Sequence, residues 1–493
     1  MTTVATRVPT WRLRAAFAQR LAAMYGREVP AYETLVEVTR AVNAAVVARD
    51  GAAAQRLGDI DRVTAERHGA IRVGTPTELA QAGRVFAAFG MAPVGFYDLR
   101  DAGPGAVPVV STAFRPVDRD ELARNPFRVF TSMLVVEDPR YFDAETQAGL
   151  RAFLDDRELF SPELLALADR AAAEGGLPEA DADALLERAT AAFALSRTPV
   201  DRRWYRHLEA VSAVAADIGG VSSTHLNHLT PRVLDIDALQ AGMEARGIAM
   251  IDEIQGPPGW DGPDLLLRQT SFRALAEERV FREPDGSITT GALRVRFGEV
   301  EQRGIAPTPR GRALYDRLVA AVDERVAAGE ARGAAAVDEW RRTVPRTERA
   351  LADAGLAFFT HRAAAAAPDV RKATFRTRDV RAFTTRELVD AGVLVAEPIV
   401  YEDFLPRSAA GIFRSNLDAA GTRDAAREGP RYDLGRLSDL LGTPVHDPMD
   451  LYAAEAAAAL RAAGAALGVT ITDPATTPTP DPTTAPIPAE EPA

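Results

Sequence analysis

Two spacings of apolar residues alternate along the chain. Spacings of three and four residues, which place apolar side chains on one face of a helix, occur in the first segments. They predict helices over Trp11–Met24, Tyr32–Val47 and Ala53–Glu66. The next region predicts the order strand, helix, strand, strand, strand. Its elements are His68–Gly74, a helix from the N-cap candidate Thr77 to about Phe89, Ala92–Leu99, Val107–Arg115 and Phe127–Val136.

The same order of elements returns after His228. This second set is a strand over His228–Ile236, a helix over Asp237–Arg246, and extended segments at Ile248–Ile254, Leu265–Phe272 and Ala292–Gln302. The tetrapeptide Thr112-Ala113-Phe114-Arg115 of the first set matches Thr270-Ser271-Phe272-Arg273 of the second, at nearly the same distance from the opening histidine. We interpret this ordered repetition as an internal duplication.

Helical spacing also fills the segment between the two sets and much of the chain after them. The pattern predicts an α+β fold with two βαβββ modules, a helical insertion and C-terminal helices. The Thr-, Pro- and Ala-rich end is predicted to be disordered. The predicted divisions are residues 1–66 (helical cap), 67–140 (first module), 141–220 (insertion), 221–311 (second module), 312–472 (helical and mixed region) and 473–493 (tail).

The composition excludes several classes of protein and site. Of the 493 residues, 47% are hydrophobic and 26% are charged, as in a soluble globular protein. A net charge of -12 argues against nucleic acid as the main partner. The absence of cysteine excludes disulfides, thiolate metal sites and cysteine nucleophiles. Neither a secretory signal nor an apolar run of about 20 residues, the length that spans a bilayer, is present, so a cytoplasmic location is expected.

Candidate metal ligands occur at places that are distant in the sequence. His68 opens the first strand, His228 opens the second set with His225 three residues before it, and a later strand carries Glu299 and Glu301. Side chains alternate along a strand, so the paired histidines face opposite sides, whereas the two glutamates share one face. If the modules close about a pseudo-twofold axis, two imidazoles and one carboxylate meet at one metal ion. That facial arrangement suits Fe(II) enzymes that bind an oxo acid and dioxygen.

Five segments resemble motifs of the 2-oxoadipate dioxygenase/decarboxylase family, in the vicinal oxygen chelate superfamily. They are Arg67–Gly74, Asn227–Arg232, Arg268–Phe272, Phe297–Gly304 and Tyr401–Pro406. The resemblance runs from about Trp11 to Leu467 and leaves out the tail. It implies that the two βαβββ modules form a curved central sheet around a metal site.

The resemblance also implies which side chains bind the metal. It places one Fe(II) ion on His68, His228 and Glu299, with no catalytic residue beyond these ligands. It therefore favours His228 over His225 and Glu299 over Glu301, a choice that strand geometry alone leaves open for the glutamates. Ligands of these types also accept manganese, cobalt, nickel or zinc.

A substrate site next to the metal is implied in the same way. Arg72 is the side chain that pairs with a substrate carboxylate, beside His68 and His228. The loop after the last motif lines the family's substrate pocket, which implies contacts from Arg407 and Ser408. Arg407 departs from the small apolar residue expected at its position, so that contact would be made by its backbone.

The implied reaction converts 2-oxoadipate and dioxygen to D-2-hydroxyglutarate and carbon dioxide, a step of lysine breakdown. Two other functions are compatible with the same residues. One is an isomerase or lyase of the superfamily that uses another divalent metal on a related 2-oxo dicarboxylate. The other is a protein that binds a dicarboxylate or a metal without catalysis. Oxygen uptake coupled to decarboxylation distinguishes the first function from both alternatives.

Other polar residues are weaker candidates for the site. Arg232 and Arg273 resemble Arg72 in their placement on strands, with less support. Thr270 and Ser271 have the hydroxyl groups to bind a carboxylate, but such residues in sheets usually pair with each other. Glu137 is interpreted as the counterpart, in the first set, of the glutamate-rich strand, and a structural role is expected for it.

Overall fold

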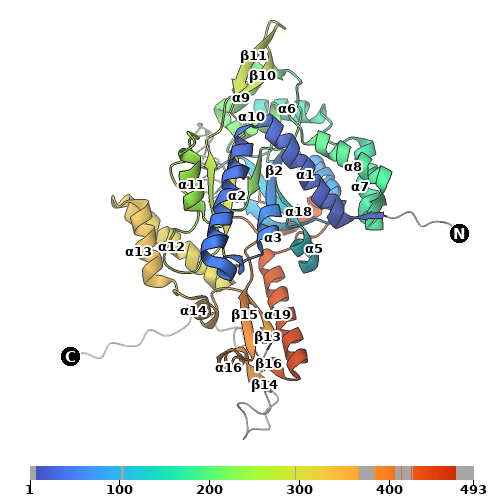
Figure 1. The fold of residues 1–493 in the computed structure, drawn as a ribbon. Coiled ribbons are helices and arrows are strands. Elements are labelled where there is room, and N and C mark those ends of the chain that lie inside the picture. The colour runs from blue at the N-terminus through green and yellow to red at the C-terminus, as the bar shows by residue number, and fades with distance from the viewer. Residues whose placement is uncertain are drawn as a thin grey trace, which may run out of the picture.

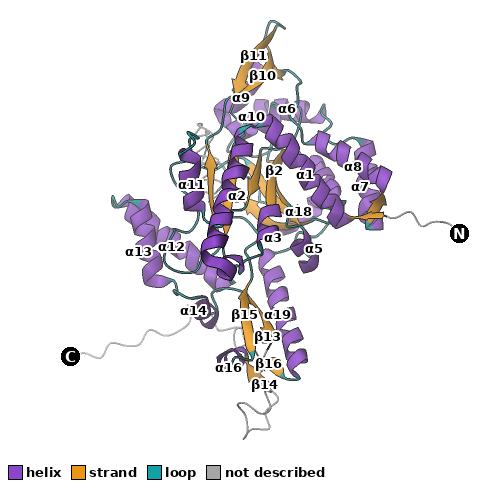
Figure 2. Cartoon of the chain, viewed as in Figure 1, coloured by secondary structure: helices purple, strands orange, loops and turns teal. Residues whose placement is uncertain are grey.

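The computed structural model of the chain describes residues 7–101, 105–294, 296–365, 382–405, 412, 423–424 and 426–472. Helices lie around a group of central strands, and both element types occur along the whole described chain (Figures 1 and 2). The prediction of a mixed helix and strand fold is confirmed. No helix among the described residues has the length and apolar character needed to cross a membrane. The predicted tail lies outside the described residues, and the domain boundaries and the cytoplasmic location stay predictions.

A five-stranded sheet with the order β3-β4-β5-β2-β8 forms the centre. Strand β2 (Arg67–Val73) pairs parallel with β5 (Arg128–Leu134) and antiparallel with β8 (His228–Pro231). Strands β4 (Val109–Arg115) and β3 (Ala92–Asp98) complete one side. Every residue of β4, β5 and β8 is buried, so both faces of these strands are covered by other parts of the protein.

A further antiparallel pair, β9 (Leu267–Phe272) and β12 (Gly298–Arg303), lies next to β8. A parallel bridge joins Arg232 to Glu301, and the amide of Val233 donates to the carbonyl of Glu301 at 2.8 Å. This contact continues the central sheet beyond β8. Strands β2 and β8 therefore lie in its middle, with the antiparallel strands β5, β4 and β3 on one side and the antiparallel pair β12 and β9 on the other.

Helices cover the sheet and extend the chain. Before the insertion they are α1 (Thr10–Glu28), α2 (Ala31–Asp50), α3 (Ile60–Ala65), α4 (Pro76–Ala87) and α5 (Arg119–Arg124). The predicted insertion holds α6 (Ala144–Asp155), α7 (Pro162–Glu174), α8 (Glu179–Ala192), α9 (Arg202–Val211) and α10 (Ala213–Gly219). The later helices are α11 (Ile236–Glu244), α12 (Pro309–Ala327), α13 (Arg332–Thr343), α14 (Glu348–Asp353), α16 (Thr385–Asp390), α18 (Leu434–Leu441) and α19 (Pro448–Leu467).

Short strands form small sheets outside the centre. They are β1 (Arg7–Pro9) with β6 (Gly176–Pro178), β7 (Val200–Asp201) with β10 (Glu277–Arg282) and β11 (Ile288–Leu293), β13 (Phe359–Ala363) with β15 (Leu394–Pro398), and β14 (Ala382–Thr384) with β16 (Thr470–Thr472). The β10–β11 hairpin projects from the body at the top of Figure 1, and β13 to β16 lie with α19 at the bottom.

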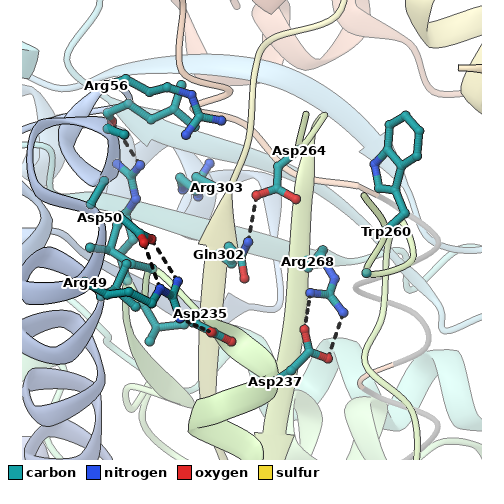
Figure 3. Close-up of a pocket in the computed structure, with 18 of the residues that line it drawn as sticks. Arg49, Asp50, Arg56, Asp235, Asp237, Trp260, Asp264, Arg268, Gln302 and Arg303 are labelled. Atoms are coloured by element: carbon teal, nitrogen blue, oxygen red, sulfur yellow. Dashed lines mark hydrogen bonds and ion pairs between the residues drawn. The ribbon is translucent and has the colours of Figure 1, made fainter. Parts of the chain in front are cut away.

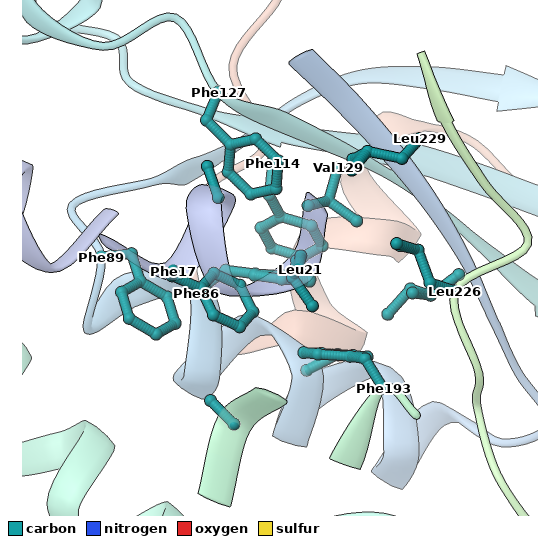
Figure 4. Close-up of a cluster of buried hydrophobic side chains, with 14 of the residues drawn as sticks. Phe17, Leu21, Phe86, Phe89, Phe114, Phe127, Val129, Phe193, Leu226 and Leu229 are labelled. Carbon is teal, nitrogen blue, oxygen red and sulfur yellow. The ribbon is translucent and has the colours of Figure 1, made fainter. Parts of the chain in front are cut away.

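One face of the central sheet buries an aromatic core against α1 and α4. Phe17 stacks on Phe89 with ring centroids 4.3 Å apart, and Phe86 lies 4.9 Å from Phe114 of β4 (Figure 4). Fully buried aromatic side chains of this size each contribute a few kcal/mol to the free energy of folding. This core holds the helices on one face of β2 and leaves the opposite face of the strand for the polar side chains His68 and Arg72.

Several predicted elements have different bounds in the structure. The helix predicted over Ala53–Glu66 is only α3, preceded by a short 3-10 turn, because Gly51 and Gly58 adopt positive φ angles of 56° and 128° that end the helical backbone. The helix α4 is capped by Thr75, whose hydroxyl accepts from the amide of Glu78, and not by Thr77. The other long helices and the strands β2 to β5 agree with the prediction to within a few residues.

The second predicted set is less regular than the first. Ile248–Ile254 is not a strand: only Met250 and the nearby Gln255 make isolated bridges, to β9. The strand predicted over Ala292–Gln302 is wrong as one element, because its first two residues end β11 at Leu293 and its last five belong to a separate strand, β12, which begins at Gly298. The β10–β11 hairpin was not predicted, since its strands are amphipathic and partly exposed.

Candidate metal centre

Three side chains from three strands converge on the face of the sheet opposite the aromatic core. His68 lies near the start of β2, and His228 opens the antiparallel strand β8, where it pairs with Ala70. The two histidines are therefore diagonal neighbours on one face. Their rings lie 5.3 Å apart, centroid to centroid, and are perpendicular at 89°. Glu299 reaches the same place from β12.

The ligand atoms of these residues are close enough to share one ion. The Nε2 atom of His68 lies 3.5 Å from Glu299 Oε2, and the Nε2 atom of His228 lies 3.5 Å from Glu299 Oε1. One ligand atom from each residue lies within 4.8 Å of the other two. His68, His228 and Glu299 thus form a possible metal-binding triad, and the prediction that these residues meet is confirmed.

The triad fits a bound cation better than a purely structural cluster. All three residues are buried, with relative exposures of 1%, 4% and 5%. Nε2 of His68 has no hydrogen-bond partner among the described residues. A buried polar atom left without a partner is costly, and a divalent ion would satisfy it. Two imidazoles and one carboxylate are ligands that iron and related metals accept.

Each of the two imidazoles has a second side chain behind it. Glu301 Oε2 lies 3.0 Å from Nδ1 of His68, and the Thr230 hydroxyl lies 3.0 Å from Nδ1 of His228. Both contacts turn the Nε2 atoms of the rings towards Glu299. Partners of this kind fix the tautomer and the orientation of metal-binding histidines.

The structure gives Glu299 and Glu301 different places although they share one strand face. Glu299 lies between the two imidazoles, whereas Glu301 is fully buried beside Arg303 and Arg128, at 2.7 and 3.3 Å. Burial raises the pKa of Glu301, but Arg303, His68 and Arg128 lower it further, so the net pKa is far below the usual value. Glu301 is therefore an ionised support for a ligand.

Electrostatics differ between the two histidines. Burial lowers the pKa of His228 to about 4; Glu299 opposes this effect, and the charges of His68 and Arg72 add to it. Burial also lowers the pKa of His68, but Glu301 and Glu299 outweigh it and raise the net value above the ordinary one. At neutral pH, His228 is thus neutral, the form of imidazole that binds a metal.

A family model for 2-oxoadipate dioxygenase/decarboxylase matches residues 17–416. The chain belongs to this family. Its relatives include the 2-oxoadipate dioxygenase/decarboxylase of Mycobacterium bovis, 54% identical over 446 residues that cover 90% of this chain and 97% of that protein. The Pseudomonas putida protein of the same name is 40% identical over 468 residues, which cover 93% of this chain and 97% of that one.

A solved structure shares the fold of this family member. Hydroxyglutarate synthase from Pseudomonas putida, in complex with 2-oxoadipate, superimposes with a TM-score of 0.79 at 38% identity. The match covers 94% of this chain and 99% of that one. Membership therefore rests on agreement over nearly the whole length, and the protein is an enzyme of the dioxygenase/decarboxylase class.

Arg72 lies on the same strand face as His68, four residues further along β2. It is buried and forms an ion pair with Asp217 of α10. Its positive charge is one of the smaller causes that lower the pKa of His228, after burial and His68. The predicted substrate contacts Arg407 and Ser408 lie outside the described residues.

Aromatic rings form the walls of the centre. Phe404 meets the ring of His68 edge-on at 5.0 Å, and Phe297 stacks on the ring of His228 at 5.6 Å. Phe130 of β5 lies 4.9 Å from Phe404. Sequence reasoning did not assign these walls, although Phe297 and Phe404 lie in segments that resemble family motifs. Apolar walls exclude water and strengthen the electrostatic interactions of the triad.

The weaker candidates are bound elsewhere. Arg232 donates to Glu66 and to the carbonyl of Leu57, both at 2.9 Å. Arg273 pairs with the exposed Asp252 at the surface. Their guanidinium groups therefore have partners that do not belong to the triad.

The remaining polar candidates also have partners or neighbours of their own. Thr270 donates to Gln240 at 2.7 Å, while Ser271 is the ladder partner of Glu299. Glu137 accepts from the hydroxyl of Tyr432 at 2.6 Å on the surface, a structural contact as predicted.

A cavity of about 600 Å³ is separate from the triad. It lies between α2, the segment after β8 and the start of β9 (Figure 3). Arg268 in its wall is already paired through two hydrogen bonds with Asp237, at 2.6 and 3.1 Å, and Arg303 with Glu301. The buried guanidinium groups of Arg268 and Arg303 are thus paired with carboxylates of the protein, and we assign no ligand to this cavity.

Proposed function

We propose that this chain is an Fe(II)-dependent dioxygenase that converts 2-oxoadipate and dioxygen to D-2-hydroxyglutarate and carbon dioxide, in lysine degradation. The observation that carries the proposal is the buried triad of His68, His228 and Glu299 in a member of this family. The relatives' names and the 2-oxoadipate in the Pseudomonas putida structure support the substrate. The reaction balances, because both atoms of dioxygen and all six carbons of the substrate appear in the two products.

His68, His228 and Glu299 would hold the metal ion. Fe(II), when bound there, would supply dioxygen activation and a chelation site for the 2-oxo acid. The protein contributes the fixed geometry: Glu301 and Thr230 hold the two imidazoles from behind. The proposed architecture is the paired-module fold of the vicinal oxygen chelate superfamily, with β2 and β8 along the pseudo-twofold axis.

Arg72 is the proposed partner of a substrate carboxylate. A guanidinium presents parallel N–H donors that match a carboxylate, and the pair is strong where water is excluded. Arg72 stands on the same strand face as His68, and its charge acts on His228. The arrangement thus combines a metal position for the oxo-acid end with a buried cation for a carboxylate. Arg407 and Ser408 belong to the proposal as further contacts.

Oxygen uptake in the presence of 2-oxoadipate and ferrous iron tests this function. We expect uptake and carbon dioxide release in equal amounts, with D-2-hydroxyglutarate as the product. The His228→Ala variant, checked for an unchanged circular dichroism spectrum, is expected to lose bound iron and activity together. Turnover of 2-oxoadipate without oxygen uptake would indicate an isomerase or lyase, and binding without turnover would indicate a sequestering protein. Either result contradicts the proposal.

A further inference from the structure

A second buried polar cluster adjoins the triad and is centred on a carboxylate from the helical insertion. Asp217 of α10 meets Arg72 of β2 together with His225 and Asn227, which lie on the segment that leads into β8. Relative exposures are 3% for Asp217 and His225, 1% for Asn227 and 5% for Arg72. Four polar side chains are therefore removed from water at the same place.

Asp217 is the acceptor that these neighbours share. Its Oδ2 atom accepts from Arg72 and, at 3.0 Å, from the side-chain amide of Asn227. Nε2 of His225 lies 3.3 Å from Oδ1. An ionised carboxylate only accepts hydrogen bonds, whereas a guanidinium only donates them. Burial raises the pKa of Asp217, but His225 and Arg72 lower it more, so this carboxylate stays ionised.

The segment before His228 is also fastened to β2. The amide of Asn227 donates to the carbonyl of Ala70 at 2.9 Å, and the hydroxyl of Thr224 donates to the carbonyl of Arg72 at 2.6 Å. These backbone contacts hold the segment without help from Asp217. The side chain of Arg72, in contrast, forms an ion pair with Asp217, which bears on the direction of its guanidinium.

We infer that Asp217 is a positioning residue for substrate binding: it holds the guanidinium of Arg72 in the direction that receives a substrate carboxylate. This inference rests on the proposed function, because Arg72 is assigned there as the substrate-binding cation. Asp217 acts through Arg72 and touches no member of the triad in any described contact. Its loss therefore affects binding of the dicarboxylate and leaves binding of the metal in place.

The Asp217→Asn variant is the main test, since it keeps the shape of the side chain. The new amide presents N–H donors to the donors of Arg72 and Asn227 and removes the counter-charge. We expect the Kd for 2-oxoadipate, measured by calorimetry on the anaerobic Fe(II)-loaded enzyme, to rise roughly tenfold to a hundredfold, the effect of losing a hydrogen bond to a charged group. The KM should rise in parallel, while kcat and iron affinity change less than about threefold, well below that loss.

Asp138 offers a matched control. It is equally buried and accepts from Arg100 at 3.0 Å and from Arg140 at 2.6 Å, away from the triad. The Asp138→Asn variant is expected to lower the Tm as Asp217→Asn does but to leave the Kd for 2-oxoadipate unchanged. If both variants weaken binding equally, Asp217 has only a structural role and the inference is wrong.

Two further variants keep the inference testable if Asp217→Asn does not fold. Asp217→Glu retains the charge and should bind 2-oxoadipate with an intermediate Kd. In an Arg72→Lys background, the Asp217→Glu change should add little further loss, because the geometry it supports is already gone. Full additivity of the two changes, or loss of iron from Asp217→Glu, contradicts the inference. Wild-type protein that neither binds nor consumes 2-oxoadipate contradicts the proposed function as well, whereas an unaffected Asp217 variant of active enzyme contradicts the inference alone.

Discussion

Two antiparallel strand pairs flank the metal centre at corresponding places in the sheet, β4–β5 beside β2 and β9–β12 beside β8. Their ladders have matching registers. Phe130 pairs with Ala113 in the first, as Glu299 pairs with Ser271 in the second. The side chain of the first pair that corresponds to the carboxylate ligand is therefore an aromatic ring.

The difference has a clear electrostatic consequence. A second carboxylate at the place of Phe130 would add another buried negative charge, which is costly without another cation. Phe130 instead contacts Phe404, which lies against the ring of His68. One strand pair thus supplies the ligand and the other supplies the apolar wall. The interpretation of Glu137 as the counterpart of the glutamate-rich strand is wrong, because Glu137 lies beyond the end of β5.

The next ladder positions differ in the same sense. Ser132 pairs with Ser111, and their hydroxyls share a hydrogen bond at 2.8 Å. Glu301 pairs with Gln269, and its carboxylate reaches His68 instead. The two strand pairs have the same backbone arrangement, yet only the second contributes a residue of the triad, Glu299, together with Glu301 behind His68.

Removing the ligand of the second strand pair has the largest expected effect. The Glu299→Gln variant should lose far more iron affinity than the roughly 10–100-fold that follows removal of an outer-shell partner. Oxygen uptake with 2-oxoadipate should fall below detection. Metal analysis after dialysis checks the iron content. Phe130→Leu, the change at the corresponding place, should keep its iron. Normal iron content in Glu299→Gln would remove this residue from the centre.

Metal loading should stabilise the fold only where the triad is complete. Fe(II) at 100 times its Kd stabilises the native state by about 2.7 kcal/mol, so anaerobic addition of iron should raise the Tm of the wild-type protein. The same addition should leave the Tm of Glu299→Gln unchanged and should still raise that of Phe130→Leu. A shift of equal size in all three proteins would indicate binding elsewhere.

Changing the arginine beside the triad should separate substrate binding from metal binding. Arg72→Lys keeps the positive charge but loses the paired donors, so kcat/KM for 2-oxoadipate should fall roughly tenfold to a hundredfold. The iron content should be unchanged, because Arg72 is not a ligand. An unaltered KM would show that this side chain does not contact the substrate.

The support behind the first imidazole should affect iron binding while turnover persists. Glu301→Gln removes the charge beside Nδ1 of His68 and should weaken iron binding about 10–100-fold, without abolishing turnover when iron is in excess. Ser132→Ala, at the corresponding place in the other strand pair, should change the iron Kd by less than about twofold, because Ser132 does not support a metal ligand. Equal effects of the two changes would contradict the asymmetry between the strand pairs.

Predictions from the chain were most accurate where burial is simple. Long helices and the strands β2 to β5 were predicted nearly at their observed bounds, because a buried face leaves a regular apolar spacing in the sequence. The second set was predicted less well. Ile248–Ile254 carries apolar residues yet forms only isolated bridges, and the hairpin β10–β11 is too exposed to leave such a spacing.

Motifs and the alternation of side chains along strands predicted part of the site and left the rest open. The motif favoured His228 over His225, and the structure places His225 outside β8 and beside Asp217, away from the triad. Alternation along the strand did not separate Glu299 from Glu301, since both point to the same face of β12. Asp217 carried no signal at all, because it lies in a helix of the insertion and meets Arg72 only in the folded chain.

The sequence by itself determined the order of elements in the first predicted set, the family, and the types of ligand available, because periodicity, motifs and residue chemistry are local properties. The tertiary structure decided which glutamate meets the imidazoles of His68 and His228 and which carboxylate holds Arg72. Those contacts join residues far apart in the chain. They depend on the register of β2 with β8 and on the packing of α10, and no spacing along one segment encodes either.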